Sequence, residues 1–323
     1  TKRYPYRGPQ KEEDTVVSSY THTVTIGQIP VLIGERINPT GKSKMKTALR
    51  ENNINYILEE GITQQEKGVQ ILDVNVGLPE IDEVKMMQKA IYELQAVLDL
   101  PLQIDTASPL VMEKAMRLYN GKPLVNSVNG KEESMETVFP LVAKYGGVII
   151  ALTLDEKGIP QSAAGRLEIA EKIIQRAAEY GIEKKDIIVD PLAMTVSADS
   201  NSANITLDTI CLLKEKLEVA TSLGVSNISF GLPNREDINA TFFAMALQNG
   251  LDCAIMNPYA LGMLKAYYSY LALRGMDANC EQYIAFATKY NTKELLSGPT
   301  EEQEKADGLE RGIEKGLKEK VRT

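Results

Sequence analysis

Histidine, tryptophan and paired cysteines are scarce or missing in this chain of 323 residues. It has no tryptophan, its one histidine is His22, and its three cysteines (Cys211, Cys253 and Cys280) stand far apart with no Cys-x-x-Cys pair. We therefore expect no Ser-His, Cys-His or His-ligated metal chemistry in the core of the fold, no disulfide framework and no zinc-thiolate site. With no metal ligands predicted, any chemistry must use carboxylates, amides, hydroxyls or a bound cofactor.

The chain also lacks an excess of positive charge and long apolar runs. Its 36 Lys and Arg against 44 Asp and Glu give a net charge of -8 at pH 7, which repels phosphate backbones and offers no cationic face to anionic lipids. No apolar run approaches the roughly 20 residues that a membrane-spanning helix needs, and the first residues lack the apolar core of a signal peptide. We expect no nucleic-acid or membrane partner and a cytoplasmic location.

The composition is that of an ordinary globular protein, with 43% hydrophobic and 25% charged residues. Because single cores stop growing at roughly 250 to 300 residues, we expect one large domain over residues 31–290 with an extension at each end. Residues 1–30 are polar and begin with Thr1, not Met, which indicates a linker, leading into a short strand or hairpin, in a piece of a longer protein. Residues 291–323 indicate a charged linker and an amphipathic helix, which either opens a further domain or ends in solvent. Its apolar positions are Leu309, Ile313, Leu317 and Val321.

From Val31 onward, short β-branched apolar runs alternate with longer stretches of helical periodicity. This alternation is typical of βα units around a parallel sheet. Eight units in roughly 240 residues predict a (β/α)8 TIM barrel, because a doubly wound sheet more often has fewer strands and a Gly-rich first turn. The predicted strands are Val31–Gly34, Ile71–Val76, Leu102–Asp105, Leu124–Ser127, Val148–Thr153, Ile187–Asp190, Asn227–Phe230 and Cys253–Met256.

Polar side chains end nearly every predicted strand, and in a TIM barrel these ends converge on one mouth. We predict a mouth rich in acceptors and amides that lacks Lys and His. Such a ring suits a neutral, planar heterocycle with several N–H donors, since each buried unpaired donor costs about 1 to 3 kcal/mol. A pterin fits, and purines or carbonyl substrates fit nearly as well. The candidate residues are Glu35, Asn38, Asp73, Asn75, Asp105, Asn126, Asp155, Asp190, Asn227, Ser229 and Asn257.

Several short motifs occur in order along residues 31–275. They are Ile33-Gly34-Glu35-Arg36-Ile37-Asn38, Leu72-Asp73-Val74-Asn75-Val76-Gly77, Ile104-Asp105-Thr106, Val125-Asn126-Ser127, Lys157-Gly158-Ile159-Pro160, Val189-Asp190-Pro191-Leu192 and Ser226-Asn227-Ile228-Ser229-Phe230-Gly231-Leu232-Pro233. The set resembles the pterin-binding methyltransferase family, whose barrel is dihydropteroate synthase-like. That family includes the folate module of cobalamin-dependent methionine synthase and the free-standing methyltetrahydrofolate:corrinoid iron-sulfur protein methyltransferase.

The resemblance implies a reaction and a set of roles. The reaction is transfer of the N5 methyl of 5-methyltetrahydrofolate to cob(I)alamin, with the corrinoid supplied by another domain or protein. Asp105, Asn126 and Asp190 would hydrogen-bond the pterin, and Asn227 would lie near N5. Because a tertiary amine leaves poorly unless its nitrogen gains positive character, Asn227, Asp105 and Asp190 are the expected catalytic residues. Glu35, Asn38, Asp73 and Ser229 complete the expected pterin-binding set.

The resemblance leaves alternatives open. The flanks of the barrel resemble those of the folate module within methionine synthase, where a cobalamin-binding domain follows, so we expect an excised module of that enzyme. A free-standing methyltransferase with a separate corrinoid protein, or a folate-binding module without catalysis, are the alternatives. Dihydropteroate synthase would need a Lys and a Ser-Arg near the late strands, where Asn257-Pro258-Tyr259-Ala260 stands instead. The three cysteines form no zinc-thiolate set, so the homocysteine half-reaction is not expected in this chain.

Overall fold

The structure is a computed structural model that describes residues 14–296, with side chains as far as residue 290. Residues 1–13 of the predicted linker and the predicted helix through Leu309 and Val321 lie outside the described residues. The chain divides into two compact units after Tyr267. Within the described range, no helix is long and apolar enough to cross a membrane.

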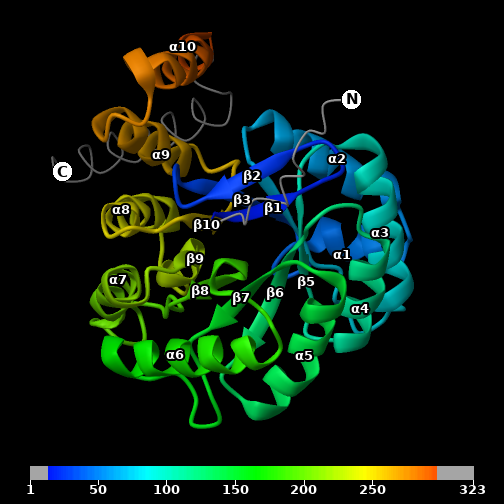
Figure 1. The fold of residues 1–323 in the computed structure, drawn as a ribbon. Coiled ribbons are helices and arrows are strands. Elements are labelled where there is room, and N and C mark those ends of the chain that lie inside the picture. Colours follow the sequence, from blue (N-terminus) through cyan, green and yellow to red (C-terminus); the bar gives the residue numbers. More distant parts are fainter. Residues whose placement is uncertain (1–13, 297–323) are drawn as a thin grey trace, which may run out of the picture. The chain divides into compact units, whose positions relative to one another are not determined.

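Eight parallel strands close into a barrel in the first unit (Figure 1). Their order around the barrel is β10-β3-β4-β5-β6-β7-β8-β9, so each strand pairs with its neighbour in sequence and the last closes on the first. The predicted TIM barrel is therefore confirmed. The strands are β3 (Val31–Ile37), β4 (Ile71–Val74), β5 (Leu102–Asp105), β6 (Leu124–Asn129), β7 (Val148–Leu152), β8 (Ile187–Asp190), β9 (Ala220–Gly224) and β10 (Cys253–Met256).

The prediction of the seventh barrel strand is wrong. Asn227–Phe230 is not a strand, because residues Val225–Ser229 form the 3-10 helix η3, and the seventh barrel strand is β9 (Ala220–Gly224). Thr221 and Ser222 of this strand are fully buried, and two hydroxyl residues in the middle of a short strand weaken its apolar signal. The Thr221 hydroxyl is satisfied by the Asp252 carboxylate at 3.1 Å. Asn227 and Ser229 therefore lie in the loop beyond the strand.

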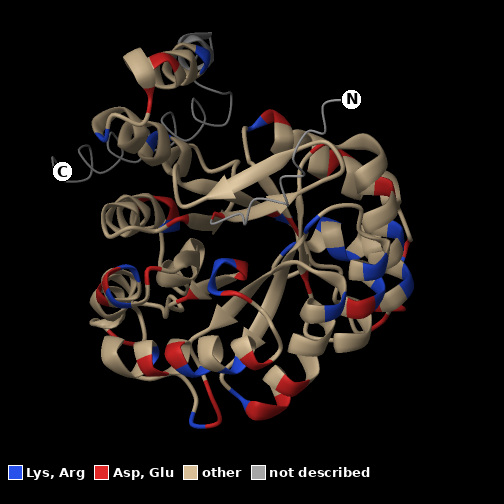
Figure 2. Ribbon diagram, viewed as in Figure 1, with Lys and Arg blue, Asp and Glu red and all other residues tan. Residues whose placement is uncertain are grey.

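Helices follow the strands and cover the outside of the barrel (Figure 1). Several begin at side-chain caps: Asp82 accepts from Lys85 N, and Ser162 accepts from Gly165 N. Charged residues gather along the outer faces of these helices (Figure 2), as expected for one apolar and one solvated face. The helices are α1 (Ser43–Arg50), α2 (Ile54–Glu66), α3 (Glu83–Val97), α4 (Pro109–Leu118), α5 (Glu132–Tyr145), α6 (Ala163–Glu179), α7 (Ser202–Leu212), α8 (Arg235–Gln248) and α9 (Leu261–Leu273).

A hairpin closes the end of the barrel where the strands begin. Strands β1 (Thr15–Ser18) and β2 (Thr23–Ile26) pair antiparallel, in the segment where the sequence predicts a short strand or hairpin. Val17, Val24 and Ile26 pack in one apolar cluster with interior residues of the barrel strands. The hairpin thus seals the bottom of the interior and leaves the carboxyl ends of the strands as its open mouth.

In the second unit, helix α10 (Glu281–Leu296) begins at a cap formed by Asp277. The Asp277 carboxylate accepts from the backbone N–H groups of Gln282 and Tyr283 at 3.0 and 2.9 Å. The rings of Tyr268 and Phe286 stack with their centroids 4.6 Å apart. These local contacts fix the start of the helix and the packing of its first turns.

Candidate functional site

The polar residues of the mouth continue the inward-facing rows of the barrel strands. Side chains alternate along a strand, so residues two apart share a face. The interior apolar cluster contains one residue from each of several strands, among them Ile33, Ile71, Leu124 and Ile188. Two positions further along these strands stand Glu35, Asp73, Asn126 and Asp190. The predicted candidates on β3, β4, β6 and β8 therefore lie in one polar layer above the apolar one.

Two carboxyl groups on adjacent strands, Asp73 and Asp105, form one side of this layer. Gln103 Nε2 donates to Asp73 Oδ1 at 2.6 Å, and Asn75 Nδ2 donates to Asp105 Oδ2 at 2.9 Å. Burial raises the pKa of Asp73 well above its ordinary value, and the nearby Asp105 charge adds to the rise. Burial also raises the pKa of Asp105, against the Asn75 hydrogen bond. The pair thus retains a proton more readily than two exposed carboxylates would.

Asp190 lies on β8, on the side of the barrel opposite the two strands that carry that pair. Its Oδ1 accepts from Leu192 N at 2.7 Å, which leaves the second carboxylate oxygen for another donor. Burial raises its pKa to about 7, opposed by the Leu192 bond and the Arg166 charge. Asn126 pairs in register with Asp105 on the neighbouring strand. Asp105, Asn126 and Asp190 therefore lie on three strands of the barrel, and their contact with a ligand stays a prediction.

Arg166 supports the loop behind Asp190 and was not among the residues predicted from the sequence. The side chain comes from the first turn of α6 and is only 1% exposed. Its guanidinium donates to the carbonyls of Pro191 and Leu192 at 2.7 and 2.8 Å, and to Pro160 O at 3.1 Å. Because these carbonyls directly follow Asp190, Arg166 fixes the path of the chain that leaves β8.

The loop after β9 carries Asn227, and hydrogen bonds from Arg235 hold this loop in place. Arg235 Nε donates to Ser229 Oγ at 3.0 Å, and Nη2 donates to Ser226 O at 2.7 Å. Ser229 is fully buried, so its hydroxyl supports the loop, whereas Asn227 is exposed at the rim. Of the two candidates predicted here, Asn227 is the one placed to contact a ligand from solvent.

The prediction that the mouth lacks lysine is wrong. Lys42 Nζ donates to the backbone oxygen of Glu35 at 3.1 Å. Burial raises the pKa of Glu35, although the charges of Lys42, Arg36 and Arg235 oppose the rise. Burial also lowers the pKa of Lys42. Lys42 precedes α1 and Arg235 begins α8, so neither stands at a strand end, where the predicted site residues lie.

Three other candidates use a side-chain oxygen in a local turn. Asn38 Oδ1 accepts from Thr40 N at 2.9 Å, Asp155 Oδ1 from Lys157 N at 2.8 Å, and Asn257 Oδ1 from Tyr259 N at 3.0 Å. Such Asx turns fix the backbone of a loop. These side-chain oxygens are therefore occupied, and the amide N–H groups of Asn38 and Asn257 are the atoms left to contact a ligand.

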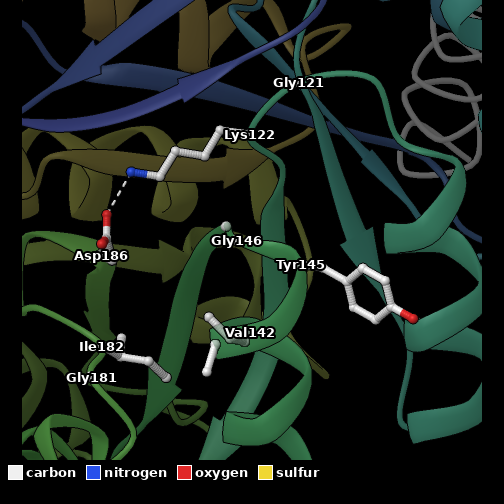
Figure 3. Close-up of a pocket in the computed structure, with 10 residues that line it drawn as sticks. Gly121, Lys122, Val142, Tyr145, Gly146, Gly181, Ile182 and Asp186 are labelled. Carbon is white, nitrogen blue, oxygen red and sulfur yellow. Dashed lines mark hydrogen bonds and ion pairs between the residues drawn. The ribbon is translucent and has the colours of Figure 1, made fainter. Parts of the chain in front are cut away.

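A separate cavity of about 260 Å³ lies near the opposite end of the barrel (Figure 3). Lys122 and Asp186, which precede β6 and β8, face each other there with Nζ and Oδ1 2.5 Å apart. Their charges neutralise each other, and residues at this end of a TIM barrel serve stability. Among residues 14–296, no three His, Cys, Asp or Glu side chains are placed to share a metal ion. The mouth is therefore the candidate site.

Comparison with known proteins agrees with this geometry. A family described as "Pterin binding enzyme" matches residues 34–257, from the middle of the first barrel strand to the residue after the last. The chain belongs to the pterin-binding enzyme family. Among curated relatives of this pterin-binding enzyme, methylcorrinoid:tetrahydrofolate methyltransferase of Eubacterium limosum is 30% identical over 257 residues, which are 78% of this chain and 94% of that protein.

A second type of relative is much longer. Methionine synthase of Mycobacterium tuberculosis is 30% identical over 259 residues, which are 76% of this pterin-binding enzyme but 22% of that protein. Methionine synthase of Mycobacterium leprae is 32% identical, with the same two shares. The chain thus spans about a fifth of these two relatives.

Solved structures share the fold of this pterin-binding enzyme. Dihydropteroate synthase from Xanthomonas albilineans, in complex with 7,8-dihydropteroate, matches with a TM-score of 0.66 at 19% identity, over 80% of this chain and 98% of that one. Dihydropteroate synthase from Yersinia pestis matches with a TM-score of 0.61 at 15% identity, over 81% and 100%. At these identities the likeness establishes a common barrel architecture.

Proposed function

We propose that this pterin-binding enzyme transfers a methyl group between N5 of tetrahydrofolate and a corrinoid carried by a partner protein. The observation that carries the proposal is the layer of acids and amides at the mouth. Asn126 and Asp190 each stand two positions beyond an apolar residue of the barrel interior, Leu124 and Ile188, and Asp105 pairs in register with Asn126 on the neighbouring strand. The Eubacterium limosum relative, named for this pair of substrates, supports the choice of reaction.

The carboxyl and amide groups suit the edge of a pterin ring. Each pterin N–H or amine group needs an acceptor once water is excluded, and bonds to a carboxylate are roughly twice as strong as neutral ones. Asp190 keeps one oxygen free of its Leu192 bond. Asp105 is oriented by Asn75, whose own Oδ1 is held by Gly77 N at 2.9 Å. The acceptors are therefore fixed before the ligand arrives, which lowers the ordering cost of binding.

Asn227 is the residue we place beside N5. It is exposed at the rim, on a loop that Arg235 anchors through Ser226 and Ser229. Its carboxamide both donates and accepts, so it can stabilise N5 with or without a proton. The corrinoid supplies the metal that gives or takes the methyl group. The barrel supplies the position of the ring and the electrostatics around N5.

The lengths of the relatives favour a free-standing methyltransferase over a module of methionine synthase. The chain covers 94% of the Eubacterium limosum methyltransferase, whereas it covers 22% of the mycobacterial methionine synthases. This revises the expectation from the sequence, which preferred the module. The partner in the proposed reaction is a corrinoid carried by another protein or another domain.

A transfer assay tests the proposal. Methyl transfer between tetrahydrofolate and cobalamin is followed anaerobically by the absorbance of the corrinoid, with and without the protein, in both directions. We expect an acceleration that is saturable in folate and abolished by Asp105→Ala together with Asp190→Ala. Saturable folate binding without acceleration of transfer, even when a corrinoid protein is added, would favour a binding module and refute the methyltransferase.

The raised pKa of Asp190 predicts proton release when the pterin binds. With a pKa of about 7 in the free protein, the carboxyl is largely protonated at about pH 6. Donors on the bound ring favour the carboxylate and lower this pKa, so binding expels up to about one proton and affinity rises with pH between about 6 and 7. Titration calorimetry in two buffers of different ionisation enthalpy measures the release. Asp190→Asn should remove this release, and an undiminished release in the variant would contradict the assignment.

A further inference from the structure

Two neighbouring loops of the mouth are joined by hydrogen bonds, and two of these bonds meet at the backbone of Phe230. The loop after β8 supplies the hydroxyls of Thr195 and Ser197, which donate to Phe230 O at 2.7 and 2.9 Å. Beside them, Val196 N donates to Ile228 O at 3.0 Å. The loop after β8 therefore fixes the chain that leaves η3 at the position of Phe230.

The side chain of Phe230 is exposed although its backbone is fixed. The residue is 68% exposed, and the Arg235 guanidinium lies over one face of the ring, 5.7 Å from its centroid. The opposite face of the ring is therefore open to solvent. An aromatic ring with a fixed backbone and one open face is suited to stack against a second planar ring.

Phe230 lies one turn beyond Asn227, the residue that we place beside N5. Its N–H donates to Asn227 O at 3.2 Å, and residues three apart in a 3-10 helix lie on the same side of it. In folates, the ring carbon bonded to N5 carries the p-aminobenzoyl group through one methylene and one nitrogen. We infer that Phe230 stacks on this p-aminobenzoyl ring and thereby selects folates over pterins that lack the arm. This inference rests on the proposed function.

The small extent of the apolar surface favours a single ring over a protein as the occupant. Within residues 14–290, Phe230 and Met194 are the exposed large apolar side chains in loops that follow barrel strands. A stable protein interface takes about 20 to 30 residues from each partner. The exposed residues that follow the Phe230 loop are polar, among them Asn234, Glu236 and Asp237. A surface of this size and polarity matches one planar ring of a small ligand.

Calorimetric titration with two matched ligands tests the inference. One is 5-methyltetrahydrofolate, and the other is 5,6-dimethyltetrahydropterin, which keeps the reduced ring and the N5 methyl group but has a methyl group in place of the arm. In Phe230→Ala, the dissociation constant of the folate should rise about tenfold, while that of the pterin should stay within about twofold of wild type. Phe230→Tyr, which keeps an aromatic ring, should bind the folate as wild type does.

Thr195→Val combined with Ser197→Ala tests the support of the ring. The two changes remove both hydroxyl donors to Phe230 O and leave the ring itself in place. A ring that is no longer fixed loses more freedom on binding, so the dissociation constant of the folate should rise about threefold or more and that of the pterin should not change. An unchanged ratio of the two constants would contradict this positioning role.

Tyr92→Ala is the matched control. Tyr92 lies on α3, outside the barrel, and is 66% exposed, so its loss should change neither dissociation constant. Equal weakening of both ligands in Phe230→Ala would overturn the inference. Wild-type folate affinity in that variant would also overturn it, even if methyl transfer with a corrinoid protein were slowed, since the ring would then contact the partner. Failure of the wild-type protein to bind either ligand would instead refute the proposed function.

Discussion

Replacing Asn227 with alanine is expected to lower the rate of methyl transfer by about 10²-fold or more, the range found when a preorganised electrostatic partner is removed. The side chain lies at the exposed rim on η3, where it can follow the change in charge at N5. In the proposed mechanism it acts mainly as the transition state forms, so the loss should appear in the single-turnover rate. The dissociation constant of 5-methyltetrahydrofolate should change by less than about tenfold.

Asp190→Asn is expected to affect folate binding, in contrast to the effect of Asn227→Ala on the rate. Asp190 is buried at the end of β8. In the proposed site it holds the ring in every state of the reaction, so its loss should mainly weaken folate binding. Stopped-flow rates and equilibrium titrations of both variants separate the two roles. Small and equal effects of the two substitutions on rate would refute the division of labour between Asn227 and Asp190.

Replacing Arg166 with methionine is expected to lower the free energy of unfolding by about 3 kcal/mol or more. The change removes a donor from three backbone carbonyls. Leu192 O keeps the Thr206 hydroxyl at 3.1 Å, whereas Pro160 O and Pro191 O lose their side-chain donor, and each unpaired group costs about 1 to 3 kcal/mol. The acceptors, Pro160 O, Pro191 O and Leu192 O, lie 2.7 to 3.1 Å from the guanidinium. Urea unfolding followed by circular dichroism measures the loss.

Arg176 on the same helix is the matched control. Its guanidinium forms ion pairs with Glu132, Glu136 and Glu179, and the side chain is 31% exposed. Ion pairs of this kind contribute about 1 kcal/mol or less, so Arg176→Met should unfold close to the wild-type midpoint. Because Arg166 also fixes the chain after Asp190, its variant should bind folate more weakly even under conditions where it is fully folded. Equal stabilities of the two variants would contradict the role assigned to Arg166.

The sequence predicted the barrel because most of its strands are short β-branched runs. Runs such as Ile187–Asp190 and Cys253–Met256 have the same bounds in the structure. The exception is β9, where Thr221 and Ser222 are buried hydroxyl residues. The alternation of Asn227–Phe230 resembled a strand more closely, although these residues turn into η3 and beyond. Local pattern could not reveal this, since the Asp252 carboxylate that satisfies Thr221 is 31 residues away.

The candidate site likewise contains residues whose position the sequence could predict and residues whose position it could not. The placement of Asp73, Asp105, Asn126 and Asp190 near the mouth could be predicted from the sequence, because the carboxyl ends of barrel strands converge there. Their part in binding stays a prediction. The supporting residues could not be predicted, because they come from other elements. Arg166 stands in the first turn of a helix, where an arginine ordinarily faces solvent, yet it is buried. Lys42 and Arg235 reach the mouth from outside the strands.

The affinity of the protein for 5-methyltetrahydrofolate, measured by titration calorimetry beside the Asp105→Ala variant, tests the central claim most directly. If the inward-facing acids and amides hold the ring, the wild-type chain binds one equivalent of folate. The variant, which leaves a buried ring donor without its acceptor, should bind at least about tenfold more weakly. Absence of binding by the wild-type chain, or equal binding by the variant, would contradict the account.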